Sequence, residues 1–184
     1  MEAKMTKRRI QTLDLVYIAA GAVLIIVCSW ISIPVNVPFT LQTFAIACIL
    51  GLLGGMRGTI SILVYILMGA IGIPVFSGFS GGFGVILGPT GGYIVGFIFM
   101  GLIYWLFERL FGKKLVIRII ALAVGLLICY AFGTAWFMYV YIRQTGPVTL
   151  VTVLGWCVFP FIIPDILKMA LALFITSRVG KYIR

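Results

Sequence analysis

The stretch that decides the fold is residues 58–107, GTISILVYILMGAIGIPVFSGFSGGFGVILGPTGGYIVGFIFMGLIYWLF, a run of 50 residues without a charged side chain. Residues 15–56, just before it, are uncharged over another 42 residues. One helix that crosses a bilayer needs roughly 20 apolar residues. Each stretch is long enough for two crossings, so the chain is an integral membrane protein.

The composition of the whole chain agrees with this class. Of its 184 residues, 63% are hydrophobic and 10% are charged, whereas soluble domains are about half apolar and a quarter charged. The formal net charge is +10, from 14 Lys and Arg against 4 Asp and Glu. Most of this charge lies at the ends of apolar segments, where the positive-inside rule explains it. The basic balance therefore does not indicate a nucleic-acid partner.

Prolines and glycines divide the chain into six expected transmembrane helices, at about residues 13–33, 41–53, 59–73, 92–110, 116–141 and 164–178. Pro164 suits the first turn of a new helix, because proline lacks the backbone N–H that is unsatisfied there anyway. Residues 148–163 are expected to form a partial helix at the outer rim. No internal repeat is evident, so residues 1–184 are predicted to be one all-α, polytopic membrane domain.

The distribution of basic residues predicts the orientation. With residues 1–9 inside, six spans place twelve Lys and Arg on the cytoplasmic side, against Arg143 outside and Lys168 within a span. A seven-span arrangement divides them nine against four. Positive charge favours the cytoplasmic side. We therefore expect six spans in the cell membrane with both termini cytoplasmic.

This orientation puts three nearly uncharged connectors on the outer face, residues 34–40, 74–92 and 142–163. The middle connector holds seven glycines between Gly78 and Gly92, and glycine permits close backbone approach to a ligand. Irregular backbone at membrane depth is tolerated where it lines a cavity. We expect a folded loop that covers a ligand; the alternative, a floppy surface loop, is normally richer in Ser, Asn, Asp and Lys.

The sharpest local feature is Pro164-Asp-Ile-Leu-Lys168. Asp165 is the one acidic residue away from the cytoplasmic segment ends, and Lys168 is the one basic residue within a span. Residues three apart share a helix face, and ionisable residues in membrane segments are candidates for function. The pair offers a small polar ligand an acceptor and several donors. The alternative is an ion pair that only holds the helix in the bundle.

Two further positions are candidates for ligand binding. Gln42 and Thr43 begin the second expected helix at its outer end and supply neutral hydrogen-bonding groups, although helix capping alone could explain them. Tyr93 follows two glycines, and it is either a ligand contact or an aromatic anchor at the membrane interface.

Several chemistries are disfavoured by what the sequence lacks. The chain has no histidine, and its four cysteines show no CxxC spacing, so neither a zinc site nor an imidazole base is expected. The cysteines are read as small buried hydrophobes. Neither Gly-Lys pair, at residues 112–113 or 180–181, has the phosphate-loop spacing. We predict no cofactor, no enzymatic activity and no ATP hydrolysis by this chain.

Three segments together resemble one known family. Val37-Pro-Phe-Thr-Leu-Gln-Thr43, Gly88-Pro-Thr-Gly-Gly-Tyr93 and Pro164-Asp-Ile-Leu-Lys168 are similar to the signature segments of BioY, the biotin-specific S component of energy-coupling-factor (ECF) transporters. The resemblance runs from about residue 10 to 180, with the segments in the same order.

This resemblance implies a six-helix S-component fold that binds biotin with high affinity near the outer surface. By the family pattern, Asp165 and Lys168 contact polar groups of biotin, and Gln42, Thr43, Gly88 and Tyr93 help to line the pocket. The implied partners are a transmembrane coupling subunit and two cytoplasmic ATPases, which drive import. The alternative is a stand-alone secondary transporter of another small polar solute. Such a transporter needs a coupling-ion site, and a single Asp–Lys pair provides few ligands for one.

Overall fold

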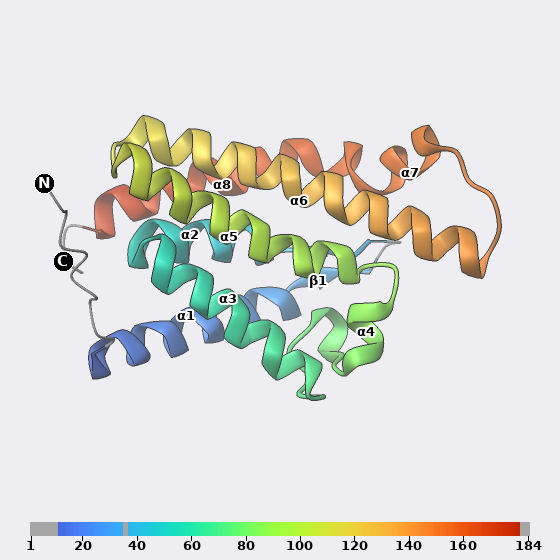
Figure 1. The fold of residues 1–184 in the computed structure, drawn as a ribbon, viewed down its shortest axis with the longest axis horizontal. Coiled ribbons are helices and arrows are strands. Elements are labelled where there is room, and N and C mark those ends of the chain that lie inside the picture. Colours follow the sequence, from blue (N-terminus) through green and yellow to red (C-terminus); the bar gives the residue numbers. More distant parts are fainter. Residues whose placement is uncertain (1–10, 35–36, 181–184) are drawn as a thin grey trace, which may run out of the picture.

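A computed structural model describes residues 11–34 and 37–180 of the chain. The described part is helical almost throughout, and its one sheet is a two-residue antiparallel pairing. Figure 1 shows an elongated bundle in which the long helices run side by side. The elements in chain order are α1 (Thr12–Trp30), β1 (Ser32–Ile33), β2 (Phe39–Thr40), α2 (Gln42–Leu53), α3 (Gly55–Ala70), η1 (Ser77–Phe79), α4 (Phe83–Leu87), α5 (Gly91–Phe111), α6 (Leu115–Gln144), α7 (Leu150–Cys157) and α8 (Phe159–Val179).

All six expected helices are present, as α1, α2, α3, α5, α6 and α8. Four apolar helical stretches are long enough to cross a membrane: α1, α5, α6 and residues 150–179. The helices α2 and α3 have 12 and 16 residues, about 18 and 24 Å at 1.5 Å per residue, against a hydrocarbon core of about 30 Å. The all-α membrane fold is therefore confirmed, while six complete crossings stay a prediction.

Two helix starts differ from the sequence-based expectation. The last helix begins at Phe159 and contains Pro164, which was expected to be its first residue. Pro160 occupies the first turn of the helix instead. Pro164 has no backbone N–H, so the helix lacks only the hydrogen bond that would reach back to a carbonyl of this first turn. The third helix begins at Gly55, directly after the turn made by Gly54 with φ 84°. It was expected to begin at Thr59.

Two of the connectors also contain more structure than expected. At the first connector, Ser32 and Ile33, which were expected in the first helix, pair with Thr40 and Phe39 in a small antiparallel ladder. The glycine-rich connector contains η1 and α4. The third connector contains α7, and the prediction of a partial helix between residues 148 and 163 is confirmed there.

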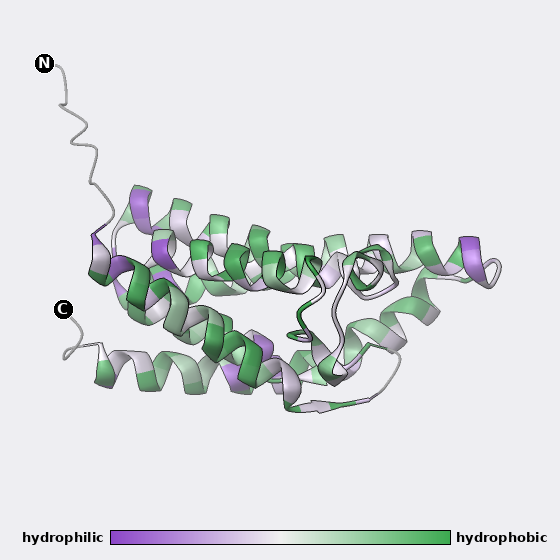
Figure 2. Cartoon of the chain, turned by 90° about the horizontal axis from the view of Figure 1, so that it is seen from below, coloured by the Kyte–Doolittle hydropathy of each residue, from purple (hydrophilic) through white to green (hydrophobic). Residues whose placement is uncertain are grey.

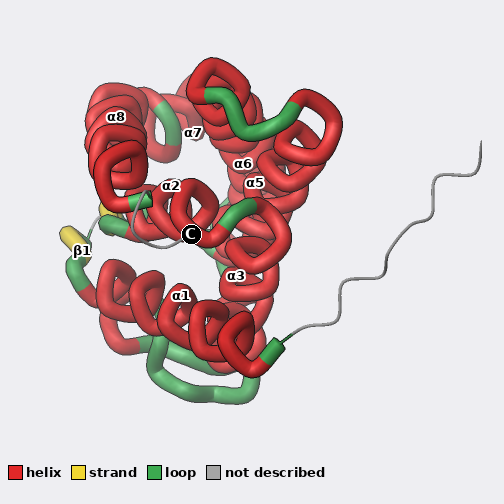
Figure 3. Tube along the Cα trace, turned by 90° about the vertical axis from the view of Figure 1, so that its left-hand side faces the viewer, coloured by secondary structure: helices red, strands yellow, loops and turns green. Residues whose placement is uncertain are grey.

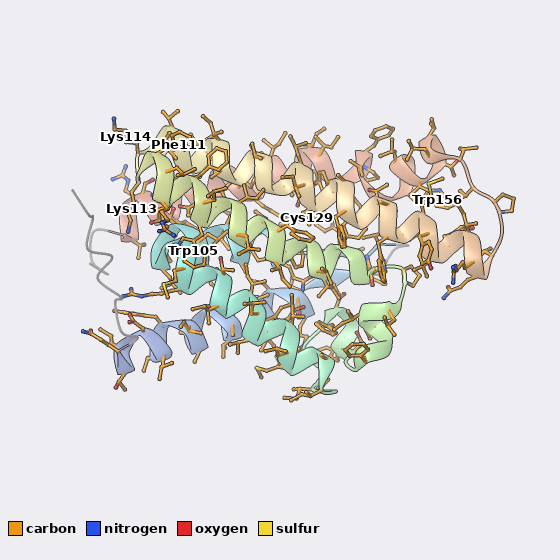
Figure 4. All side chains as sticks on the ribbon, viewed as in Figure 1. Trp105, Phe111, Lys113, Lys114, Cys129 and Trp156 are labelled. Atoms are coloured by element: carbon orange, nitrogen blue, oxygen red, sulfur yellow. The ribbon has the colours of Figure 1, made fainter. Side chains whose placement is uncertain are left out.

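The helices pack in pairs around a buried α2. The main pairings are α5 with α6, α2 with α8, and α3 with both α1 and α5. Close approach of α5 to α6 requires Gly96, because a Cβ at this position would lie 2.8 Å from Cys129 Sγ. Cys129 lies midway along the bundle in Figure 4. All four cysteines are buried and unpaired, as the sequence predicted.

The two ends of the bundle differ in charge. One end, here the charged end, is where α1 begins and α8 finishes, and Figure 4 places Lys113 and Lys114 there. Hydrophilic colour gathers at this end in Figure 2. Ion pairs among the described residues there join Arg57 to Asp14 and Lys113 to Glu108. The opposite end, here the loop end, holds the three connectors that were expected outside.

Candidate functional site

A cavity of 220 Å³ lies toward the loop end of the bundle. A site for one water needs only about 15 Å³, so this cavity is on the scale of a small-molecule ligand. All three outer connectors or the helix starts next to them contribute to its wall. The lining residues are Val37, Pro38, Thr40, Gln42, Thr43, Tyr65, Phe76, Ser77, Ser80, Val85, Thr90, Tyr93, Ile94, Phe97, Leu126, Cys129, Tyr130, Cys157, Phe161, Asp165 and Lys168.

Asp165 is the centre of the polar part of this wall. Its side chain accepts three hydrogen bonds: Oδ1 from Thr43 Oγ1 at 2.8 Å and from Lys168 Nζ at 2.9 Å, and Oδ2 from the Tyr130 hydroxyl at 2.5 Å. The residue is 2% exposed. An ionised carboxylate has about four acceptor sites. Within the described residues, Oδ2 therefore keeps one acceptor site for a ligand.

Lys168 neutralises this buried carboxylate. Besides Asp165, its ammonium group donates to the backbone carbonyl of Thr40 at 2.7 Å and lies 4.0 Å from the centre of the Phe39 ring. The predicted i, i+3 placement of the pair on one helix face is confirmed. Buried charges are stable when they are paired and hydrogen-bonded. The pair is thus both a structural link from α8 to the strand before α2 and a polar surface of the cavity.

The side chains of Gln42 and Thr43 line the cavity, and neither caps α2. Gln42 Nε2 donates to the Tyr65 hydroxyl at 2.5 Å, and Gln42 Oε1 accepts from Thr40 Oγ1 at 3.0 Å. The residue before α2 is Leu41, whose side chain makes no capping bond, and the backbone N–H of Gln42 donates to Thr40 Oγ1 at 3.3 Å. The capping interpretation of Gln42 and Thr43 is therefore wrong.

Tyr93 and Gly88 lie differently relative to the cavity. Tyr93 lines it, is 9% exposed, and shares a hydrogen bond of 2.9 Å with Thr134 Oγ1. This burial contradicts the alternative of an interfacial anchor. Gly88 is not among the lining residues, and its carbonyl accepts a hydrogen bond from Trp136 Nε1 at 3.0 Å. Contact of either residue with a ligand stays a prediction.

The glycine-rich connector is folded against the cavity. Phe76, Ser77 and Ser80 line the cavity, and Phe76 is 1% exposed. Two side chains of α1 hold the connector in place: Ser29 Oγ donates to the carbonyl of Val75 at 2.5 Å, and Trp30 Nε1 donates to that of Pro74 at 3.0 Å. The alternative interpretation of this segment as a floppy surface loop is therefore wrong.

Two tyrosines of the site were not predicted from the sequence. Tyr130 on α6 donates to Asp165, and Tyr65 on α3 accepts from Gln42. Both lie in the middle of apolar helices, where a tyrosine hydroxyl needs a hydrogen-bond partner. That need is a usable signal, but it does not say which helix supplies the partner.

Comparison with known proteins gives one consistent family. Residues 2–184 match the BioY family. A probable biotin transporter BioY of Pyrococcus horikoshii is 43% identical over 143 residues, which cover 78% of this chain and 80% of that protein. The biotin transporter BioY of Thermotoga maritima is 40% identical over 162 residues, which cover 86% of this chain and 90% of that protein.

A solved structure has the same fold. It is a 2.1 Å crystal structure of the S-component for biotin from an ECF-type ABC transporter. The two chains share 28% identity with a TM-score of 0.80, over 94% of this chain and 95% of the other. The fold is thus that of an ECF S-component, and the chain belongs to the BioY family.

Proposed function

We propose that this chain is the membrane-embedded biotin-binding subunit of an ECF-type vitamin uptake transporter. The single observation that carries the proposal is the Asp165–Lys168 pair inside the cavity, supported by Thr43 and Tyr130. Relatives that cover most of the chain are named biotin transporters, which also favours a role in transport over enzymatic chemistry.

The chemistry of the cavity suits biotin. The ureido ring of biotin has two N–H donors beside one carbonyl, and the rest of the molecule is a thioether ring and an aliphatic acid. Asp165 Oδ2 has an acceptor site for a ureido N–H, while Ile94, Phe97 and Leu126 supply apolar wall for the remainder. Small-molecule sites commonly combine an apolar lining with a few placed polar groups.

The import step requires further subunits. This chain has no phosphate loop, so ATP hydrolysis belongs to other proteins of the assembly. The solved structure with the same fold is an S-component of an ECF-type ABC transporter, which supports a coupling module as the partner. We assign to it a transmembrane coupling subunit and two cytoplasmic ATPases.

The proposed orientation puts the charged end at the cytoplasm. Six described cations lie at that end, near the start of α3, the end of α5, the start of α6 and the end of α8, whereas Arg143 lies in the last turn of α6, at the loop end. Because basic residues favour the cytoplasmic side, the cavity would open toward the outer face of the cell membrane, where biotin is captured.

Equilibrium binding of labelled biotin to the purified chain in detergent tests the proposal. We expect tight 1:1 binding, weakened at least tenfold by Asp165→Asn, about 1.4 kcal/mol. The matched control is Asp14→Asn, which removes a buried carboxylate at the charged end and should leave biotin affinity unchanged. If the folded parent does not bind biotin, the proposed function is wrong. If the parent binds biotin and Asp165→Asn binds it equally tightly, biotin remains the ligand and Asp165 has a structural role.

A further inference from the structure

A second concave feature lies on the membrane-facing side of the bundle, at the charged end. It is a groove of 360 Å³ between the start of α6 and the end of α8. The helix α6 packs mainly against α5, and α8 mainly against α2. Figure 3, viewed from the charged end, shows that α8 and α6 are not neighbouring helices along their backbones. The groove is lined by Leu115, Ile119, Ala170, Leu173, Phe174, Ser177 and Arg178.

The lining changes from apolar to cationic along the groove. Leu115, Ile119 and Phe174 are 51%, 46% and 61% exposed. At the rim, the guanidinium carbon of Arg178 lies 5.6 Å from the centre of the Phe174 ring. Within the described part of the chain, Arg178 forms no ion pair. An apolar channel that ends at an unpaired cation complements an acyl chain joined to an anionic headgroup.

A second cation, Arg118, lies behind the groove, and none of the described acidic residues pairs with it. It comes one turn after Leu115 on α6 and is half-buried. Its Nε donates to the Tyr104 hydroxyl at 3.1 Å, and one terminal nitrogen donates to Thr176 Oγ1 at 2.8 Å and to the carbonyl of Gly51 at 3.1 Å. All these partners are neutral. A cation held within a membrane bundle is costly in free energy when no anion compensates it.

The charge at this end cannot be balanced from within the described residues. Asp14 is occupied by Arg57, and Glu108 by Lys113 and the backbone N–H of Gly55. The described residues at this end include six cations and these two carboxylates, so four positive charges are left over. The neighbouring headgroup layer is therefore a favourable place for an anion.

We propose that the groove between α6 and α8 binds one acidic phospholipid of the leaflet at the charged end. Its phosphate lies against Arg178, within the field of Arg118, and one acyl chain lies along Leu115, Leu173 and Phe174. The lipid fills the space between the two helices that supply Tyr130 and Asp165 to the cavity. This inference does not depend on the identity of the cavity ligand.

Native mass spectrometry of the full chain in neutral detergent tests the proposal, with phosphatidylglycerol and phosphatidylcholine of the same acyl chains as probes. We expect a 1:1 adduct with at least tenfold preference for phosphatidylglycerol. Arg178→Gln should reduce that preference to near unity. Arg143→Gln is the matched control, because Arg143 is also exposed near a helix end over an aromatic ring, at 4.6 Å from the Tyr139 centroid, but lies at the loop end.

A second variant pair tests the apolar part of the groove without changing charge. Ala170→Phe fills the groove and should abolish the adduct, while Ala131→Phe, at an exposed position of α6 away from the lining, should keep it. Four results would overturn the proposal: equal affinity for the two lipids, an equal loss in Arg143→Gln and Arg178→Gln, displacement of the lipid by inorganic phosphate, or a dimer of this chain that occupies the groove instead.

Discussion

Tyr130 donates a hydrogen bond to Asp165 Oδ2 across 2.5 Å, and this bond joins α6 to α8 inside the cavity. The two helices pack mainly against other partners, α6 on α5 and α8 on α2. The bond therefore closes a ring of helices around the cavity. It also directs the carboxylate, because Oδ1 is held separately by Thr43 and Lys168.

Tyr130→Phe should lower both stability and biotin affinity. A hydrogen bond to a charged group contributes about 1.5–3 kcal/mol, so the free energy of unfolding should fall by about that amount. Biotin affinity should fall several-fold, because the carboxylate is less fixed. Thermal unfolding in detergent and labelled-biotin binding give the two readouts. Tyr139→Phe, at a 51% exposed tyrosine of the same helix, is the control, and an effect as large as that of Tyr130→Phe would contradict the assignment.

The Asp165–Lys168 pair should behave as one coupled unit. Removing one partner of a buried ion pair leaves an uncompensated charge, which costs about 3–5 kcal/mol. We expect Asp165→Asn and Lys168→Met each to lower the unfolding free energy by this order. The double variant should lose clearly less than the sum of the two, since neither charge is then unpaired. Additive losses in a thermal or denaturant unfolding series would show that the two charges act independently.

The sequence predicts the helices of this fold because the signals that define them are local. Long uncharged runs require membrane helices, and the prolines and glycines divide those runs at about the observed places. Asp165 and Lys168 stand out for the same reason, since ionised side chains are rare inside the apolar segments. Their placement on one face follows from helix geometry alone.

The parts that escaped prediction depend on contacts between distant segments. Nothing near Tyr130 in the sequence identifies Asp165, 35 residues later, as its partner. The pairing of residues 32–33 with 39–40 is closer in sequence, but residues 32–33 continue an apolar run that favours helix. The start of α8 was misplaced because two prolines, Pro160 and Pro164, both fit a first turn, and local preference does not choose between them.

Gly133→Ala should disturb the cavity wall through Tyr93. A Cβ at position 133 would lie 2.2 Å from Tyr93 Cδ1, while the Tyr93 hydroxyl is held by Thr134. The ring cannot shift without losing that bond, so overpacking of about 1–3 kcal/mol is expected, together with weaker biotin binding. Gly155→Ala is the control, because a Cβ there would meet nothing within 4 Å. Unchanged unfolding and binding in the Gly133 variant would show that Tyr93 moves freely.

The two ends of α6 give a direct test of the proposed orientation. This helix has 30 residues, about 45 Å at 1.5 Å per residue, so its ends lie beyond a hydrocarbon core of about 30 Å. Lys114→Cys and Gln144→Cys put one exposed thiol at each end, and the four native cysteines are buried. A membrane-impermeant maleimide should label the Gln144 variant in intact cells.

The Lys114 variant should react with the same reagent only after the membrane is permeabilised. The parent chain measures background from the native cysteines, which should stay unlabelled in folded protein. The reverse pattern would place the charged end outside, against the positive-inside rule, and would turn the cavity toward the cytoplasm. Labelling of both variants from outside would show that α6 does not cross the membrane.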